Sequence, residues 1–190
     1  MTPALRFEPE LLLRAQGPQF GVRAAIFDVD GVLTDGRLFI GAEGESFKAF
    51  HVLDGHGLKL LAQGGITPLV VTGRDSAAVR RRIADLGLEH AVYGSHDKHA
   101  AAAGLLATLG IEWPQVAVIG DDWPDLPLFE AAGFCCAPPQ AHAEVLALAD
   151  HVTRARGGHG AAREFCDLLL MAAGRYAGLL QAQRQTLDAR

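Results

Sequence analysis

The sequence predicts an α/β fold, Rossmann-like, in which a mostly parallel β-sheet is covered by helices on both faces. Two patterns support this class. Short apolar runs rich in β-branched residues alternate with segments of helical character, and acidic residues, a threonine and glycines follow where the apolar runs end. Because ligands bind such folds at the carboxyl ends of the strands, the second pattern also places the candidate site.

Five short apolar runs bounded by turn residues are the expected strands. They span residues 23–28, 66–72, 90–94, 116–120 and 133–137. Four segments that each open with an aspartate and close with a glycine are the expected helices, at 54–65, 75–87, 97–110 and 125–133. An aspartate can cap a helix N-terminus, and glycine readily ends a helix.

One stretch departs from this alternation. Residues 37–50 hold two β-like runs around the turn-forming sequence Gly-Ala-Glu-Gly, which predicts a β-hairpin. This hairpin is too small to be a capping domain, and the sequence shows no internal repeat or linker. We therefore expect a single capless domain over 1–190, with an N-terminal extension (1–22), a hairpin flap and a C-terminal loop and helix (154–190).

Composition limits the function classes. The chain has 190 residues, 49% of them hydrophobic, and a net charge of -5, which argues against a nucleic acid or an anionic membrane as partner. The three cysteines, Cys135, Cys136 and Cys166, form no CxxC pair, and the N-terminus lacks a basic leader with a signal-type apolar core. These features predict a small-molecule partner and a reduced, cytoplasmic setting.

In the stretch AAIFDVDGVLTDG, two carboxylates, Asp28 and Asp30, follow a short apolar run, and Gly31 comes directly after them. A carboxylate that attacks a phosphate dianion meets charge repulsion, so the reaction needs a divalent cation and positioned donors. Asp28 is the candidate nucleophile, and Asp30 is the candidate general acid and base. Gly31 lets the backbone approach the phosphoryl oxygens closely.

The ends of the other strands supply the remaining groups. Thr72 offers a hydroxyl donor, and Lys98, one of three lysines with Lys48 and Lys59, offers a compact cation to neutralise Asp28. Asp121 completes an oxygen-rich metal site with Asp28 and the backbone carbonyl of Asp30. Hard oxygen ligands suit Mg2+.

Each motif also has a purely structural interpretation. A DxD sequence alone is commonly a turn or a helix cap, and Asp121 and Asp122 could cap a helix that starts near Pro124. His96 and His99 lie three apart, but no third soft ligand has matching spacing, so we interpret them as solvated rather than zinc-binding. The joint presence of four motifs favours the catalytic interpretation.

The motifs DVDGV, VTGR, DK and GDDWPD, in this order, resemble the haloacid dehalogenase superfamily of aspartate-nucleophile phosphatases. The stretches FHVLDGHG, GSHDK and VTRARGGHGAAREFCDLLL extend the resemblance, over about residues 23–172, to phosphatases of phosphorylated sugar acids. The resemblance implies a capless, Mg2+-dependent homotetramer that takes part in lipopolysaccharide precursor synthesis. It departs at Leu53 and His159, where these phosphatases usually carry arginine.

The resemblance also implies a set of substrate contacts. Lys59, Arg74 and Arg82 would recognise anionic groups of the substrate. The full set is Gly31, His51, Asp54, Gly55, Lys59, Gly73, Arg74 and Arg82, with Asp122, Asp125, Gly158 and His159 as further candidates. Within the expected homotetramer, hairpins pack at the centre and residues 157–160 close the site of a neighbouring subunit.

Three function classes remain in comparison. A phosphatase could act on an eight-carbon or a nine-carbon sugar acid phosphate. A phosphoacceptor receiver module also uses acidic residues, threonine and lysine, but here an acidic pair follows the lysine, and this order argues against it. A non-catalytic module of the phosphatase fold would lack hydrolysis of p-nitrophenyl phosphate, with or without Mg2+.

Overall fold

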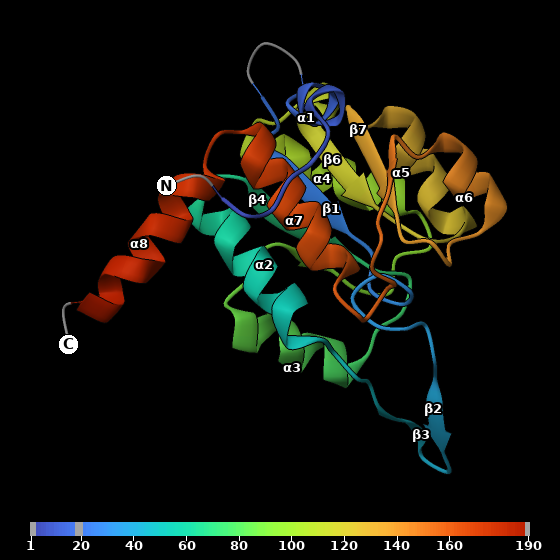
Figure 1. The fold of residues 1–190 in the computed structure, drawn as a ribbon. Helices are drawn as coiled ribbons and strands as arrows, with labels where there is room; N and C mark the ends of the chain where they lie inside the picture. The colour runs from blue at the N-terminus through green and yellow to red at the C-terminus, as the bar shows by residue number, and fades with distance from the viewer. Residues whose placement is uncertain (1–2, 18–20, 189–190) are drawn as a thin grey trace.

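Six parallel strands form the central sheet, in the order β5-β4-β1-β6-β7-β8. This structure is a computed structural model that describes residues 3–17 and 21–188. The strands are β1 (Ala24–Phe27), β4 (Thr67–Val71), β5 (Ala91–Val92), β6 (Val116–Ile119), β7 (Phe134–Ala137) and β8 (His151–Val152) (Figure 1). The five expected strands are confirmed, and β8 is an addition that the sequence analysis did not predict.

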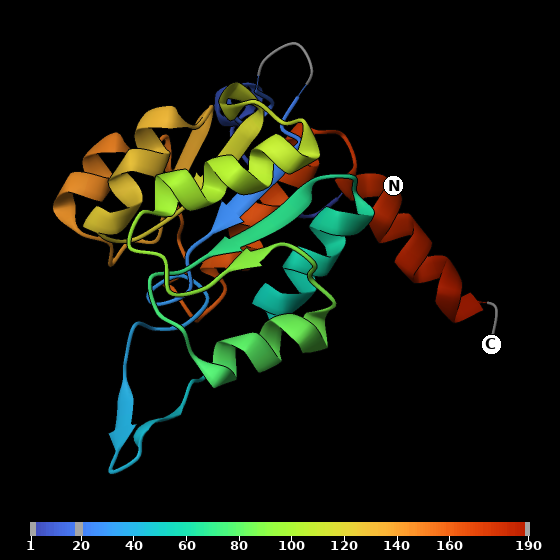
Figure 2. The same cartoon turned by 180° about the vertical axis from the view of Figure 1, so that it is seen from behind.

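Helices cover both faces of this sheet, which confirms the predicted fold class (Figure 2). The helices are α1 (Pro9–Ala15), α2 (Val52–Gln63), α3 (Ala77–Leu86), α4 (Lys98–Leu109), α5 (Leu126–Ala131), α6 (Ala143–Leu148), α7 (Ala161–Ala172) and α8 (Tyr176–Asp188), with 3-10 turns η1 (Trp113–Gln115) and η2 (Trp123–Asp125). No helix in the described ranges combines the length and hydropathy that crossing a membrane requires.

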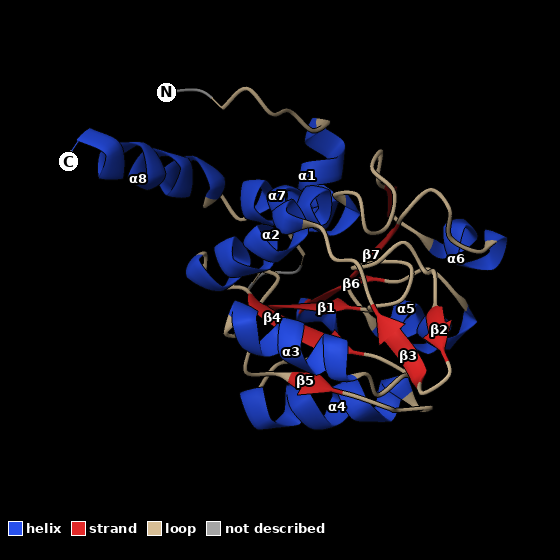
Figure 3. Ribbon diagram, turned by 90° about the horizontal axis from the view of Figure 1, so that it is seen from below, coloured by secondary structure: helices blue, strands red, loops and turns tan. Residues whose placement is uncertain are grey.

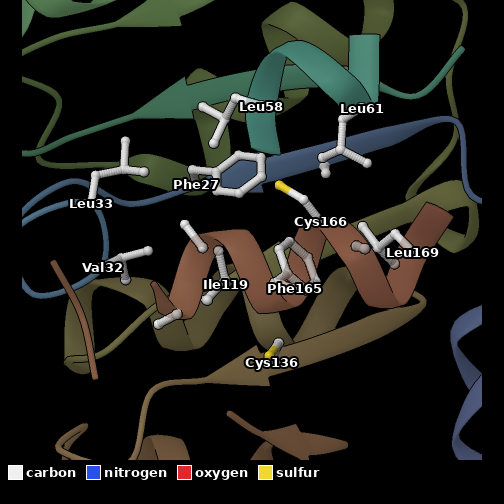
Figure 4. Close-up of a cluster of buried hydrophobic side chains, with 14 of the residues drawn as sticks. Phe27, Val32, Leu33, Leu58, Leu61, Ile119, Cys136, Phe165, Cys166 and Leu169 are labelled. Atoms are coloured by element: carbon white, nitrogen blue, oxygen red, sulfur yellow. The ribbon is translucent and has the colours of Figure 1, made fainter. Parts of the chain in front are cut away.

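Alternate side chains of β1 pack into the hydrophobic clusters on the two opposite faces of the sheet. Phe27 joins the cluster under α2 and α7, whereas Ile26 joins the cluster under α4 and α5. The rings of Phe27 and Phe165 meet edge to face, with centroids 5.5 Å apart (Figure 4). Full burial of such a side chain stabilises the fold by roughly 1.5–3 kcal/mol, so the central strand is anchored on both sides.

Helix capping differs from the expectation. Asp97 caps α4 as predicted, since its carboxylate accepts from the N–H of Ala100 at 2.9 Å. The other three aspartates do not cap: α2 begins after His51, α3 is capped by Ser76, and Asp125 makes no side-chain cap at α5. Asp125 fails as a cap because its carboxylate is engaged by Lys98 and by backbone N–H groups that precede the helix.

The predicted hairpin is present. Strands β2 (Phe39–Gly41) and β3 (Gly44–Phe47) pair antiparallel and extend away from the sheet (Figure 1). The C-terminal region holds two helices, α7 and α8, where the sequence predicted one. The break between them contains Gly174 in the left-handed conformation, which ends α7.

The chain order reverses beside β1. From β1 the chain passes to β4 and β5 on one side, and then returns to β6, β7 and β8 on the other side. A reversal of this kind opens a crevice outside the carboxyl ends of the two flanking strands. The loops after β1 and β6 therefore meet at one edge of the sheet, near the hairpin (Figure 3).

Candidate active site

The loops after β1 and β6 bring three carboxylates together. Side-chain oxygens of Asp28, Asp121 and Asp125 all lie within 4.8 Å of one another. The N–H of Asp28 donates to the carbonyl of Ile119 at 3.1 Å, so the sheet ladder itself fixes the candidate nucleophile. The predicted juxtaposition of Asp28 and Asp121 is thus present, and Asp125 joins them.

Lys98 lies at the centre of this acidic cluster. Its Nζ donates to Asp28 Oδ1 at 2.6 Å and to Asp125 Oδ1 at 2.7 Å. The side chain is 5% exposed, and Lys98 is the first residue of α4, directly after the capping Asp97. The capped N-terminus of α4 therefore directs the Lys98 ammonium toward the carboxylate of Asp28.

Asp125 organises the loop after β6. Its Oδ2 accepts from the N–H of Asp121 at 3.0 Å and from the N–H of Asp122 at 3.4 Å. With Oδ1 bound to Lys98, both oxygens of Asp125 are engaged within the protein. Asp122 is exposed and takes part in the capping box of η2, so the structural interpretation of Asp122 holds.

The electrostatics of the cluster show an excess of negative charge. Burial raises the pKa of Asp28 to about 7, and the charge of Asp125 adds to this rise. Burial likewise raises the pKa of Asp121 to about 8, with repulsion from Asp28 and Asp125. Burial alone would lower the pKa of Lys98, but the charges of Asp28 and Asp125 raise it well above its usual range.

A divalent cation fits this donor set. One ammonium faces three clustered carboxylates, two of them buried and that of Asp121 half-buried, so a further positive charge would restore neutrality and allow Asp28 to stay ionised. The donors are all hard carboxylate oxygens, which suit Mg2+ rather than a soft-ligand metal such as zinc.

Gly31 is required by this packing. Its φ of +100° lies in the region that favours glycine, and a Cβ here would lie 1.9 Å from Oδ2 of Asp121. The carbonyl of Gly31 accepts from Nε2 of Gln140 at 2.8 Å. The loop after β1 is thus held from both sides.

The C-terminal loop packs against this same loop of its own chain. The N–H of Gly157 donates to Oε1 of Gln140 at 3.1 Å, and a Cβ on Gly157 would lie 1.7 Å from the carbonyl oxygen of Gly31. The N–H of Gly158 donates to the carbonyl of Val32 at 2.9 Å. Within one chain, the lack of side chains at these two glycines permits backbone-to-backbone packing against the loop after β1. The expectation that residues 157–160 close the site of a neighbouring subunit stays a prediction.

Thr72 follows β4 directly and is buried, and its hydroxyl oxygen accepts from the N–H of Arg74 at 3.3 Å. Arg74 follows Gly73 and reaches toward the acid: its Nε lies 3.8 Å from Oδ2 of Asp30. The structure therefore brings Arg74 to Asp30, as the strand-end pattern predicted.

Two hairpin residues missed by the sequence analysis form a charge network with Asp30, in which Lys48 contacts Asp30 and Glu45 contacts Lys48. Nζ of Lys48 donates to Oδ1 of Asp30 and lies 3.2 Å from Oε2 of Glu45. The Lys48 side chain is 1% exposed although it comes from a projecting hairpin. The scarcity of lysine that drew attention to Lys98 applied equally to Lys48 and was a usable signal.

Asp54, which the sequence analysis gave as a substrate contact, lies where α2 meets the N-terminus of α7. Its Oδ1 accepts from the N–H of Arg163 at 2.8 Å, and its Oδ2 accepts from the N–H of Gly160 at 3.3 Å. Asp54 therefore caps the N-terminus of α7 and ties it to α2. Its contact with a substrate stays a prediction.

The other proposed substrate contacts lie around the N-terminus of α2. A Cβ on Gly55 would lie 2.3 Å from Nη2 of Arg82, so this glycine leaves room for Arg82, which donates to the carbonyl of His51 at 3.3 Å. The buried Nδ1 of His51 has no hydrogen-bond partner among the described residues. Lys59 and His159 are exposed, and no contact joins them to the acidic cluster within the described chain.

Comparison with known proteins identifies relatives along most of the chain. Residues 92–165 match the family of haloacid dehalogenase-like hydrolases. The 3-deoxy-D-manno-octulosonate 8-phosphate phosphatase KdsC of Escherichia coli (strain K12) is 44% identical over 154 residues, which cover 81% of this chain and 82% of that protein.

Two solved structures share the fold and carry ligands. The 3-deoxy-D-manno-octulosonate 8-phosphate phosphatase of Moraxella catarrhalis, in complex with magnesium ion, phosphate ion and KDO, has a TM-score of 0.85 at 40% identity, covering 91% of this chain and 97% of that chain. The cobalt-bound deoxy-D-mannose-octulosonate 8-phosphate phosphatase of Haemophilus influenzae has a TM-score of 0.80 at 43% identity, covering 87% of this chain and 93% of that chain. Together with the three clustered aspartates, these ions indicate the use of a divalent metal.

Proposed function

This chain belongs to the 3-deoxy-D-manno-octulosonate 8-phosphate phosphatase family of haloacid dehalogenase-like hydrolases, and on that premise we propose that it hydrolyses 3-deoxy-D-manno-octulosonate 8-phosphate through a phosphoryl group carried by Asp28. As a member of this family it is a phosphoric monoester hydrolase. The observation that carries the proposal is the ammonium of Lys98 held between Asp28 and Asp125 at the switch point of the sheet.

Asp28, Asp121 and the backbone carbonyl of Asp30 would hold the proposed Mg2+. When bound, the cation supplies the positive charge that lets a carboxylate approach a phosphate dianion. The rise in the pKa of Asp28 and Asp121 without a cation supports this requirement, since both carboxylates are buried beside like charge.

The protein's own groups then carry the reaction. A carboxylate oxygen of Asp28 attacks phosphorus, the bond from phosphorus to the sugar oxygen breaks, and Asp30 gives its proton to that oxygen. Lys98 and the hydroxyl of Thr72 donate to the phosphoryl oxygens as charge develops on them. In the second step, Asp30 takes a proton from a water that attacks phosphorus, and Asp28 is released as a carboxylate.

The substrate's non-reacting end would lie under the hairpin. Arg74 stands beside Asp30 at this side of the site, which supports a role in binding an anionic group of the sugar acid. Lys59 and Arg82 stay candidates for the same role. Because Leu53 and His159 replace the arginines usual in these phosphatases, a nine-carbon sugar acid 9-phosphate is the alternative substrate.

Self-association as a homotetramer belongs to the same proposal. Three apolar hairpin side chains, Leu38, Ile40 and Phe47, are exposed, and so are Val52 and Leu53 at the start of α2. Exposed apolar side chains gathered in this way are typical of protein interfaces, which supports packing between hairpins. We also place the enzyme in the cytoplasm, which agrees with three buried cysteines that form no disulfide among the described residues.

A substrate panel tests the proposed function. Values of kcat/KM for the eight-carbon 8-phosphate and for a nine-carbon 9-phosphate, with Mg2+, with Ca2+ and with excess chelator, report both specificity and metal use. We expect the eight-carbon substrate to be preferred, Mg2+ to exceed Ca2+, and chelator to silence the enzyme. Full activity in chelator would contradict the metal site, and no hydrolysis of any phosphate ester would favour a non-catalytic module.

A further inference from the structure

Glu45, Lys48, Arg74 and Asp30 form a charge network at the base of the hairpin. The reaction described above gives no role to Glu45 or Lys48. Lys48 lies directly after β3, and its buried ammonium contacts Oδ1 of Asp30 and Oε2 of Glu45. A lysine this deeply buried on a projecting hairpin has lost its hydration, and it is retained where partners of opposite charge replace water. The network therefore needs an explanation beyond solvation of the hairpin surface.

The two carboxylate oxygens of Asp30 have different surroundings. Oδ1 accepts from Lys48, whereas Oδ2 is buried and has no hydrogen-bond partner among the described residues. The nearest cation to Oδ2 is Nε of Arg74 at 3.8 Å, which is too long for a hydrogen bond. Buried polar atoms are nearly always paired, so an unpaired oxygen in a catalytic crevice indicates a place where a ligand's polar group binds.

We propose that Lys48 is a positioning residue that holds Oδ1 of Asp30 and thereby presents Oδ2 to the leaving-group oxygen of the substrate. A general acid must offer one oxygen at hydrogen-bond distance from the atom it protonates, in a fixed orientation. Lys48 supplies that orientation by holding the other carboxylate oxygen, Oδ1. This inference rests on the proposed function, because it assigns a partner to the acid of that reaction.

Glu45 and Ser76 extend this arrangement to the body of the protein. The hydroxyl of Ser76, at the N-terminus of α3, donates to Oε1 of Glu45, and Oε2 of Glu45 faces Lys48. Burial alone would raise the pKa of Glu45, but hydrogen bonds from Ser76 and Lys48 lower it, which keeps the carboxylate ionised. These successive contacts run from Ser76 through Glu45 and Lys48 to Asp30. They therefore orient the acid only while the hairpin is docked.

Substitution of Lys48 tests the inference through the nature of the leaving group. The variants are Lys48→Met and Lys48→Arg, and the readout is kcat/KM for 3-deoxy-D-manno-octulosonate 8-phosphate and for p-nitrophenyl phosphate, which reports the steps up to departure of the leaving group. We expect Lys48→Met to lower kcat/KM about 100-fold for the sugar substrate and less than about threefold for the nitrophenyl ester, since nitrophenolate needs little protonation. Lys48→Arg should restore most of the loss.

Arg37→Met is the matched control, because Arg37 is a hairpin cation that is 78% exposed and faces Asp35 at 3.7 Å rather than Asp30. It should leave both substrates unchanged. Equal losses on both substrates with Lys48→Met would overturn the inference and reduce Lys48 to a structural contact. If Lys48→Met does not fold, Glu45→Gln should show the same leaving-group selectivity at smaller size, and equal effects on both substrates would again overturn it. Failure of wild-type protein to hydrolyse either ester would instead contradict the proposed function.

Discussion

The acidic cluster and the hairpin network meet at one edge of the sheet but are held in place by different means. Asp28, Asp121, Asp125 and Lys98 lie at strand ends and at a helix start, fixed by the sheet ladder and by backbone N–H groups. Lys48 and Arg74 reach Asp30 through ion pairs, and Glu45 pairs with both of these cations. The proposed nucleophile is therefore preorganised by the fold, whereas the proposed acid depends on a docked hairpin.

This difference separates stability from turnover. Buried charges within the acidic cluster affect both, because removal of one partner leaves the others uncompensated in a dry environment. In the hairpin network the Arg74 side chain is 48% exposed, so loss of this charge costs little stability. Substitutions in the two regions should therefore give different combinations of lost activity and lost stability.

The largest effect is expected for Asp28→Asn. The amide keeps the shape of the side chain and loses the nucleophile, so kcat should fall by about a million-fold, the scale seen when a nucleophile is removed from an enzyme that works through it. The measurement is steady-state hydrolysis with Mg2+, alongside a circular dichroism spectrum that should match wild type. Near-normal turnover by a folded Asp28→Asn protein would remove Asp28 from the central role.

Lys98→Met should produce the largest loss of stability. It leaves Asp28 and Asp125 without their shared cation, so the free energy of unfolding should drop by about 3–5 kcal/mol. Urea denaturation in the absence of metal measures this drop. Arg74→Met is the comparison from the hairpin network and should cost less than about 1 kcal/mol, so similar losses in the two variants would break the distinction between the regions.

Gly157→Ala should disturb the nucleophile loop from the C-terminal side. The new methyl group would lie 1.7 Å from the carbonyl oxygen of Gly31, which forces a backbone shift costing about 1–3 kcal/mol and lowers kcat. Gly104→Ala in α4 is the matched control, because a Cβ there meets nothing within 4 Å and favours the helix. The measurements are the Tm and the kcat of both variants. If Gly157→Ala keeps the Tm and kcat of wild type, the C-terminal loop does not support the loop after β1.

A further effect is a pH dependence of stability centred on the acidic cluster. Asp28 and Asp121 have pKa values raised from 3.8 to about 7 and about 8, so the metal-free folded state binds more protons than the unfolded state. Its stability should therefore fall as the pH rises between about 4 and 8. Mg2+ relieves the repulsion and should raise Tm more at about pH 8 than at about pH 5. An equal rise at both pH values would contradict this origin.

Much of the fold followed from periodicity in the sequence. The five expected strands and the hairpin are confirmed, because their apolar runs and glycine turns are local signals. Strand β8 was missed because His151–Val152 lies outside any apolar run, and α8 was missed because its sequence holds many polar residues and opens with no capping aspartate. The aspartate caps were overpredicted, since a cap depends on which donors the tertiary structure leaves free.

The candidate site divides in the same way. Asp28, Lys98 and Asp121 were predicted from their places at strand and helix ends, and the structure brings them together. The role of Asp54 as a cap of α7, and the contact of Gly157 with Gly31, join residues more than 100 positions apart and leave no local pattern. Lys48 reaches Asp30 only because the hairpin folds back, which no periodicity in the hairpin sequence predicts.

The central claim is that Asp28 carries the phosphoryl group, and rapid acid quench followed by peptide mass mapping tests it most directly. Wild-type enzyme, mixed with 3-deoxy-D-manno-octulosonate 8-phosphate and Mg2+ and quenched during turnover, should yield a phosphorylated peptide that contains Asp28. The Asp28→Asn protein should yield none. A phosphoryl group on another residue, or full turnover by the wild-type enzyme with no phosphorylated peptide at any quench time, would contradict the account.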